Sequence, residues 1–448
     1  MIFTIFFGVL GLGIMIFVHE LGHFIAAKKV GIGVEVFSLG WGRKMIGFSR
    51  GETSYQLSWV PIGGYCKMKG DDIFDNEEVI HRKGSFFAAS PLRRIIVAFS
   101  GPLANMLFAL IILTIIWWIG FKIYSDENRI ILADDYNNEI SAGILPAAKA
   151  GLITGDRIIG INDNRIEKFQ DILEIVSTSP GKELILSVQR EGSLLNIRIV
   201  PELDLQTGAG KIGVYAWRDL VIGQLDPGGA AFLAGLKPGD RITALNGKEV
   251  GHTLDLYQAL AGNPQAITVI YQRGAQKRET DLVVSYQENG SADLGLSFKV
   301  KVFSSPDISL PAALLKGAAE TYRTLGLTIK GITLLFSGVN LQNAVAGPLR
   351  ITYYVGSVAR SGFRLGIGSG LVSFFRFLCL LSVVLFIMNL LPLPALDGGQ
   401  ILIFLIEIIR RKAISPTIIY RIQIVGFSIL IVLVLFFTFN DILFFMGR

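Results

Sequence analysis

Two histidines and a glutamate stand together near the start of the chain, in His19-Glu20-Leu21-Gly22-His23. Residues four apart share one face of a helix, so both imidazoles could bind a single metal ion. Glu20 projects beside them, where it could take a proton from a water that the ion activates. The chain has only 4 histidines, and two fall in this pattern. Coincidence is therefore a poor explanation, and the pattern predicts a metal site.

The segment before these residues, Met1 to Val18, carries no charged side chain. A run this long and apolar predicts a membrane-spanning helix. It lacks the basic start and the small-residue cleavage site of a signal peptide, and cleavage after it would discard the histidines. We therefore expect a retained transmembrane helix over residues 1–27. Ionisable groups on such a helix are costly and indicate function.

The composition points to a membrane protein. Of 448 residues, 51% are hydrophobic and 17% are charged, against about 25% charged in soluble proteins. The net charge is +6, but the basic residues cluster beside apolar segments, which indicates membrane topology and argues against nucleic acid as a partner. The 2 cysteines imply no disulfide framework.

Four segments are expected to span a bilayer. They are residues 1–27, residues 95–121, residues 377–396 within 371–400, and residues 422–440 within 401–448. Basic pairs at Lys28-Lys29, Arg93-Arg94 and Arg410-Arg411 predict which ends are cytoplasmic. Both termini then lie outside, although Arg364 and Arg376 on the outer side count against this orientation.

Residues 28–94 form the loop between the first two spans, and within it Val34 to Met68 alternates apolar and polar side chains, with turn signals at Gly40, Gly51 and Gly63-Gly64. This predicts short β-strands in hairpins. The segment is unusually aromatic, so it could dip into the membrane or form a small cytoplasmic sheet; the residues alone leave both open. His81 is interpreted as a solvated loop residue and not as a ligand.

The middle of the chain contains an internal repeat. Ala150 to Ile158 matches Ala234 to Ile242 at an offset of 235 − 151 = 84 residues, and both copies read A-G-L-x-x-G-D-x-I. We expect two small α+β domains over residues 122–208 and 209–303. The signature resembles PDZ domains of the bacterial, circularly permuted type, which implies a groove for an extended peptide; rigid spacers are the alternative. Residues 304–370 are expected to be a linker with amphipathic helices at the membrane surface.

A third metal ligand is expected far along the chain. The third span ends in Asn389-Leu390-Leu391-Pro392-Leu393-Pro394-Ala395-Leu396-Asp397-Gly398-Gly399, where two prolines break the helix at membrane depth. Asp397 falls on the same membrane side as the histidines. Taken alone it could be a helix N-cap. Because a catalytic zinc usually has three protein ligands and an open position, the ligand interpretation is favoured.

Together these features resemble the site-2 protease family of intramembrane metalloproteases, and within it the bacterial members that regulate sigma-E. The matching elements are H-E-L-G-H, the segment Ser100 to Asn105 (G-P-x-x-N), the segment Pro61 to Met68, the two repeats, and N-x-x-P-x-P-x-L-D-G-G. They cover essentially the whole chain.

This resemblance implies residue roles. His19, His23 and Asp397 would bind Zn²⁺, and Glu20 would be the catalytic base. Asn389 would help to hold the substrate strand. The hairpin that contains Gly64 and Tyr65 would guide it, and Pro394 is included in the same substrate-binding set.

The expected fold is therefore a multi-domain membrane protein with a four-helix transmembrane core, a membrane-associated β-hairpin region and two tandem periplasmic PDZ domains. The expected location is the bacterial inner membrane, with the active site near the cytoplasmic face. The expected partners are the lipid bilayer, PDZ peptide ligands, and single-span membrane proteins as substrates, such as anti-sigma factor stubs and remnant signal peptides. Two alternatives are a non-enzymatic PDZ scaffold and a metalloprotease that cuts soluble peptides at the membrane surface.

Overall fold

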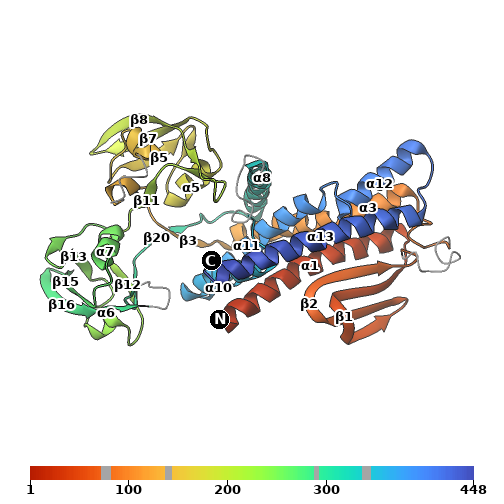
Figure 1. Cartoon of the computed structure of the whole chain (residues 1–448), viewed down its shortest axis with the longest axis horizontal. Helices are drawn as coiled ribbons and strands as arrows, with labels where there is room; N and C mark the ends of the chain where they lie inside the picture. Colours follow the sequence, from red (N-terminus) through yellow and green to blue (C-terminus); the bar gives the residue numbers. More distant parts are fainter. Residues whose placement is uncertain (72–81, 137–143, 287–291, 335–344, 448) are drawn as a thin grey trace. The chain divides into compact units, whose positions relative to one another are not determined.

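The computed structural model describes residues 1–71, 82–136, 144–286, 292–334 and 345–447. His81, expected to be a solvated loop residue, lies outside them. The chain divides into two compact units (Figure 1). The helical unit comprises Met1–Phe121 and Ser305–Arg448, and the strand-rich unit comprises Lys122–Ser304. Each is described by itself.

The helical unit is built around α3. Its helices are α1 (Ile2–Val30), α3 (Pro91–Ile119), α8 (Leu310–Leu334), α10 (Pro348–Arg364), α11 (Ile367–Asn389), α12 (Asp397–Arg410) and α13 (Pro416–Phe445). Within the described residues, α1, α3, α11 and α13 are long and apolar enough to cross a membrane, which agrees with the four expected spans. α3 packs against α1, α8, α11 and α12, and so it contacts both helices that carry the predicted ligands.

Two of these helices begin earlier than the apolar segments predicted. α3 starts at Pro91 and includes Arg94, and α11 starts at Ile367 and includes Arg376. The expected spans excluded these charges, but both arginines are paired. Arg94 forms a buried ion pair with Glu407 of α12. Arg376 lies 2.5 Å from a carboxylate oxygen of Glu320 on α8. A paired charge can stay within a helix that continues past it.

The expected hairpin region forms two long strands, β1 (Val34–Arg50) and β2 (Thr53–Met68), where short strands were predicted. The start of β1 lies between two segments of β2. Val36–Leu39 pairs on one side with Ser54–Leu57 and on the other with Gly64–Lys67. The expected turn residues Gly40, Gly51 and Gly63 have φ angles of 87°, 60° and 101°, which favour glycine.

The sheet packs on α1 through aromatic side chains. Phe37 lies 5.9 Å from Phe17 and 5.3 Å from Phe24, and Tyr55 lies 5.8 Å from Phe24, measured between ring centroids. The final segment of β2 pairs only with the start of β1 in the described sheet, so it forms an edge. This edge runs beside the helix that carries the histidines.

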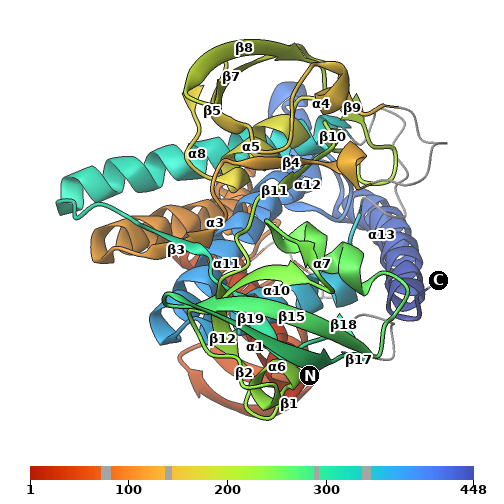
Figure 2. The ribbon, with the colours of Figure 1, turned by 90° about the vertical axis from the view of Figure 1, so that its left-hand side faces the viewer.

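The strand-rich unit contains two copies of one arrangement, which Figure 2 shows from the side. The sheet of the first copy has the order β6-β5-β7-β8 and that of the second has the order β14-β13-β15-β16. The first copy contains β4 (Ile130–Leu132), η1 (Ala133–Asp135), α4 (Pro146–Lys149), β5 (Arg157–Ile161), β6 (Asn164–Arg165), α5 (Phe169–Ser177), β7 (Leu184–Arg190), β8 (Ser193–Ile199), β9 (Glu202–Leu203) and β10 (Gly210–Lys211). Then follow β11 (Val214–Ala216), β12 (Ile222–Leu225), α6 (Ala230–Leu233), β13 (Arg241–Leu245), β14 (Lys248–Glu249), α7 (Thr253–Leu260), β15 (Ala266–Arg273), β16 (Gln276–Val283), β17 (Ser285–Tyr286), β18 (Ala292–Asp293) and β19 (Leu296–Phe298). β3 (Lys122–Ser125) pairs with β20 (Lys301–Ser304) where the unit begins and ends.

The aspartate of the repeated Gly-Asp pair makes the same contacts in both copies. Asp156 is buried and accepts two hydrogen bonds from Arg190, each 2.8 Å long. Asp240, 84 residues later, accepts equivalent bonds from Arg273. The burial of a carboxylate is tolerated here because a bidentate arginine compensates for lost water. The signature therefore fixes the fold of each copy.

A polar cluster joins the two copies. The Tyr136 hydroxyl donates to Oδ1 of Asp255 at 2.7 Å and lies 3.1 Å from Nε2 of His252. Since that hydroxyl has one proton, His252 Nε2–H must donate to it, and Nδ1 has no hydrogen-bond partner among the residues that the structure describes. His252, predicted to be structural, is the N-cap residue of α7. Burial lowers its pKa, although nearby Asp255 acts in the opposite direction.

We predict that acid loosens this cluster. Because the pKa of His252 is lower folded than unfolded, the unfolded segment binds more protons, and stability falls as the pH drops through about 6.5. Amide hydrogen exchange of α7 in the full chain, corrected for intrinsic rates, should be several-fold faster at pH 5.5 than at pH 8. In His252→Gln this difference should disappear. An unchanged pH dependence in that variant would contradict the assignment.

Candidate metal centre

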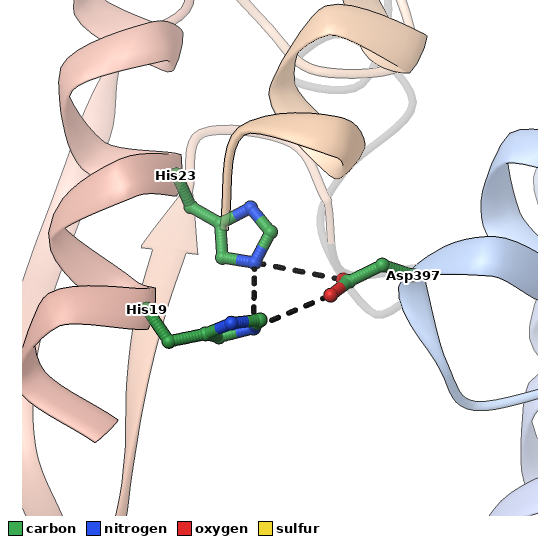
Figure 3. A group of neighbouring side chains, drawn as sticks. All are labelled: His19, His23 and Asp397. Atoms are coloured by element: carbon green, nitrogen blue, oxygen red, sulfur yellow. Dashed lines mark hydrogen bonds and ion pairs between the residues drawn. The ribbon is translucent and has the colours of Figure 1, made fainter. Parts of the chain in front are cut away.

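Three predicted ligands meet in the helical unit. His19 and His23 are one turn apart on α1, and Asp397 begins α12 (Figure 3). The Nε2 atoms of the histidines are 3.2 Å apart. Asp397 places Oδ2 3.3 Å from His19 Nε2 and Oδ1 3.5 Å from His23 Nε2.

These distances suit a zinc ion. Ligands at about 2.0–2.1 Å in a tetrahedron lie about 3.3 Å apart, close to the separations of the three side chains. Two imidazoles and one carboxylate are also a donor set typical of catalytic zinc, and they leave a fourth position for water or substrate. The residues present therefore fit the metal.

α3 orients His23. Its Nδ1 lies 2.8 Å from the carbonyl oxygen of Val97, and the ring is buried. A carbonyl oxygen only accepts, so Nδ1 must carry the proton, and the lone pair on Nε2 is free to face Asp397. The packing of α3 against α1 thus selects the histidine tautomer that can bind a metal.

Two glycines let the helices approach closely enough for that bond. A Cβ atom at Gly101 of α3 would overlap the imidazole of His23. A Cβ atom at Gly22 of α1 would overlap the backbone carbonyl of Ser100. Neither glycine has positive φ, so the requirement is for space and not for backbone freedom.

Asp397 directly follows a tightly packed turn between α11 and α12, and this turn sets its position. Leu396 is the N-cap residue of α12, so Asp397 lies one position inside the helix, with its carboxylate against the histidines. Ala395 has a φ of 76°, which is strained for a residue with a side chain. Cβ atoms at Gly398 and Gly399 would overlap carbonyl groups of the turn. The N-cap role considered for Asp397 is therefore filled by another residue.

The triad opens on a cavity of about 450 Å³. Glu20 lines it beside the edge of β2, represented by Gly64 and Tyr65, and Asn389 lines it at the end of α11. The remaining member of the predicted set, Pro394, does not line this cavity. Its ring and carbonyl instead lie against Gly426 of α13, where a Cβ atom would overlap them.

Neither a contact for Asn105 nor the need for space at Gly101 was predicted from the sequence. Asn105 Nδ2 lies 3.3 Å from His19 Nδ1. Both residues belong to the G-P-x-x-N element, which was a signal of the family but not of any contact. The contact of His23 with the Val97 carbonyl could not be predicted from the sequence, because every residue has a backbone carbonyl.

Comparison with known proteins gives a consistent result. The family described as peptidase family M50 matches residues 7–433. The chain is 38% identical to a Treponema pallidum protein named "Putative zinc metalloprotease", covering 98% of each chain. It is 28% identical to "Zinc metalloprotease RasP" of Geobacillus kaustophilus, covering 96% of this chain and 95% of the other.

Among solved structures, the PDZ domain of an SdrC-like protein from Listeria monocytogenes covers 19% of this chain and 90% of that domain, at 14% identity. The TM-score of 0.17 is too low to support an argument about either copy of the repeat.

We predict that Gly101→Ala weakens zinc binding, because the added methyl group would push the His23 ring away from its partners. Zinc content of the purified protein should fall severalfold. Gly13→Ala on α1 is the control, since nothing lies within 4 Å of its added Cβ atom. Equal zinc content in the two variants would contradict the close-packing argument.

Asp397→Ala should reduce zinc affinity by about tenfold or more, because loss of a direct ligand should cost at least as much as loss of an outer partner. Competition with a chromophoric chelator measures the change. Asp307→Ala removes an exposed carboxylate elsewhere in the helical unit and should leave affinity unaltered. Full zinc occupancy in Asp397→Ala at limiting zinc would remove Asp397 from the ligand set.

Proposed function

The chain belongs to peptidase family M50 and is a zinc metalloprotease, and we propose that it cuts single-span membrane proteins within or near their transmembrane segments. The observation that carries this proposal is the position of His19 and His23 on α1, directly after the 18 uncharged residues with which the chain begins, where Asp397 of α12 meets them. The family and the named relatives favour a protease over the non-enzymatic scaffold.

His19, His23 and Asp397 are proposed to hold the zinc. The ion supplies Lewis acidity, which acidifies a water molecule and polarises the carbonyl of the scissile bond. Glu20 lines the same cavity and is proposed to accept the proton of the attacking water and pass it to the leaving amine. Val97 keeps the imidazole of His23 in its metal-binding tautomer throughout.

Substrate is proposed to enter as an extended strand. A transmembrane helix satisfies its own backbone hydrogen bonds, so a peptide bond inside it is shielded until the helix unwinds. The edge of β2 at Gly64 to Met68 could replace those bonds by pairing with the unwound segment. Asn389, on the same cavity, would hold the strand from the other side. Pro394 would act only indirectly, by shaping the turn that carries Asp397.

Exposed apolar side chains support an interpretation of the β1–β2 sheet as membrane-associated. The exposed fractions of Trp41, Ile46, Phe48 and Trp59 are 49%, 68%, 64% and 67%. Such side chains are costly in water and are typical of a surface that meets lipid. We therefore favour the sheet dipping into the bilayer over a cytoplasmic one.

We propose that the protein is a multi-pass protein of the bacterial inner membrane, with both termini outside and the active site near the cytoplasmic face. Lys28 and Lys29 end α1, and Arg410 ends α12, which supports this orientation. The copies in the strand-rich unit would then be tandem periplasmic PDZ domains, over residues 122–208 and 209–303.

A groove in the second copy supports a peptide-binding role for it. A cavity of about 580 Å³ lies between α7 and β19, and both apolar and polar side chains form its walls. They include Leu256, Tyr257, Leu260, Leu294, Leu296 and Phe298. We propose that the domains admit only substrates whose outer portion is short, such as a trimmed anti-sigma factor or a remnant signal peptide.

Glu20→Gln should keep zinc and lose cleavage by about 10²–10⁴-fold, because the amide cannot take the proton. His23→Ala should lose both. The assay is cleavage of a tagged single-span protein in detergent, with zinc content measured on the same samples. Glu52→Gln in the β1–β2 turn is the control. Full activity of Glu20→Gln would show that the base is another group.

The same assay tests the remaining alternative, a protease of soluble peptides. A soluble peptide with the residues around the cut site should be cleaved much more slowly than the membrane-spanning protein. Equal rates would contradict the intramembrane proposal while leaving the zinc site intact.

A further inference from the structure

His19 has a polar partner in α3 that the proposed mechanism does not use. Asn105 is fully buried, with 0% of its surface exposed, and its side-chain amide lies 3.3 Å from Nδ1 of His19. The other end of that amide, Oδ1, has no hydrogen-bond partner among the described residues. A buried amide with an unpaired end costs about 1–3 kcal/mol, so its presence requires an explanation.

The orientation of the amide decides which proton His19 carries. With Nδ2 toward the ring, Nδ1 must accept, and the ring proton sits on Nε2, aimed at Asp397 and His23. A protonated Nε2 cannot bind a metal. The oxygen and nitrogen of an amide occupy nearly identical positions, so a half turn of the group fits the same space.

His23 provides the internal comparison. Its Nδ1 faces the carbonyl oxygen of Val97, which can only accept, so its proton is on Nδ1 and its Nε2 is free. His19 needs the same arrangement if both rings are to point lone pairs at one ion. Among the described side chains, Asn105 is the one whose amide oxygen can reach Nδ1 of His19.

We propose that Asn105 is a positioning residue that accepts the Nδ1 proton of His19 through Oδ1 and so fixes the metal-binding tautomer of that ring. This inference rests on the proposed zinc site. Asn105 does not line the cavity, so it acts through His19 and touches neither substrate nor water there. α3 then orients both histidines, one by a backbone carbonyl and one by a side-chain amide oxygen.

The tautomer can be read without metal or activity. Replacing His81 and His252 with glutamine leaves two histidines in the chain. Solid-state nitrogen NMR of this metal-free, ¹⁵N-histidine-labelled protein in lipid at pH 8 should show both rings protonated on Nδ1. In Asn105→Leu, the His19 signal should move to the Nε2–H form while that of His23 stays. His23 therefore also reports correct folding.

Zinc affinity provides the second readout. Asn105→Leu should raise the zinc dissociation constant about 10–100-fold, as expected for loss of an outer partner. Asn105→Asp keeps an acceptor and has no donor when ionised, so it should hold the Nδ1–H form and stay within a few-fold of the parent. Thr114→Val, a polar-to-apolar change elsewhere on α3, should change neither readout.

Three outcomes would overturn the proposal. They are an Nε2–H tautomer of His19 in the parent protein, an unchanged tautomer and affinity in Asn105→Leu, and loss of the Nδ1–H form in Asn105→Asp. If the parent protein bound no zinc, the proposed function would fail, but the metal-free spectra would still decide the role of Asn105.

Discussion

The buried ion pair between Arg94 of α3 and Glu407 of α12 is the contact on which the proposed metal centre depends. Their side chains are 4% and 1% exposed, and Glu407 also accepts the amide of Ile414 at 2.9 Å. Removing one partner of such a pair would leave an uncompensated charge, so the two helices are held together. Asp397 stands 10 residues before Glu407, about 15 Å along α12. The pair therefore fixes the helix that carries the third ligand.

The same helix, α3, also contacts His19 and His23, the other two proposed ligands. One helix therefore positions all three ligands. It contacts His23 through a backbone carbonyl and His19 through Asn105, and it approaches α1 closely because Gly22 and Gly101 have no side chains. The proposed metal ligands themselves come from α1 and α12. A rigid α3 between them converts three separate side chains into one site.

The sequence was sufficient to predict the family and the pairing of His19 with His23, because both depend on residue types at fixed spacing. Spacing four on an apolar helix brings His19 and His23 together whatever the rest of the chain does. The bounds of α3 and α11 were predicted less well, because Arg94 and Arg376 resemble helix ends until their partners Glu407 and Glu320 are known. Long-range contacts of this kind leave no local pattern. The Val97 carbonyl and the close packing at Gly101 were unpredictable for the same reason.

The distance between the ligands along the chain has a consequence for biosynthesis. Asp397 follows His23 by 397 − 23 = 374 residues. At synthesis rates of about 5–20 residues per second, α1 waits in the membrane for about 20–75 s before α12 exists. During that time the chain has two of its three ligands and no turn to close the cavity. A protease whose proposed metal ligands come from both ends of its chain would thus stay inactive until most of that chain has been translated.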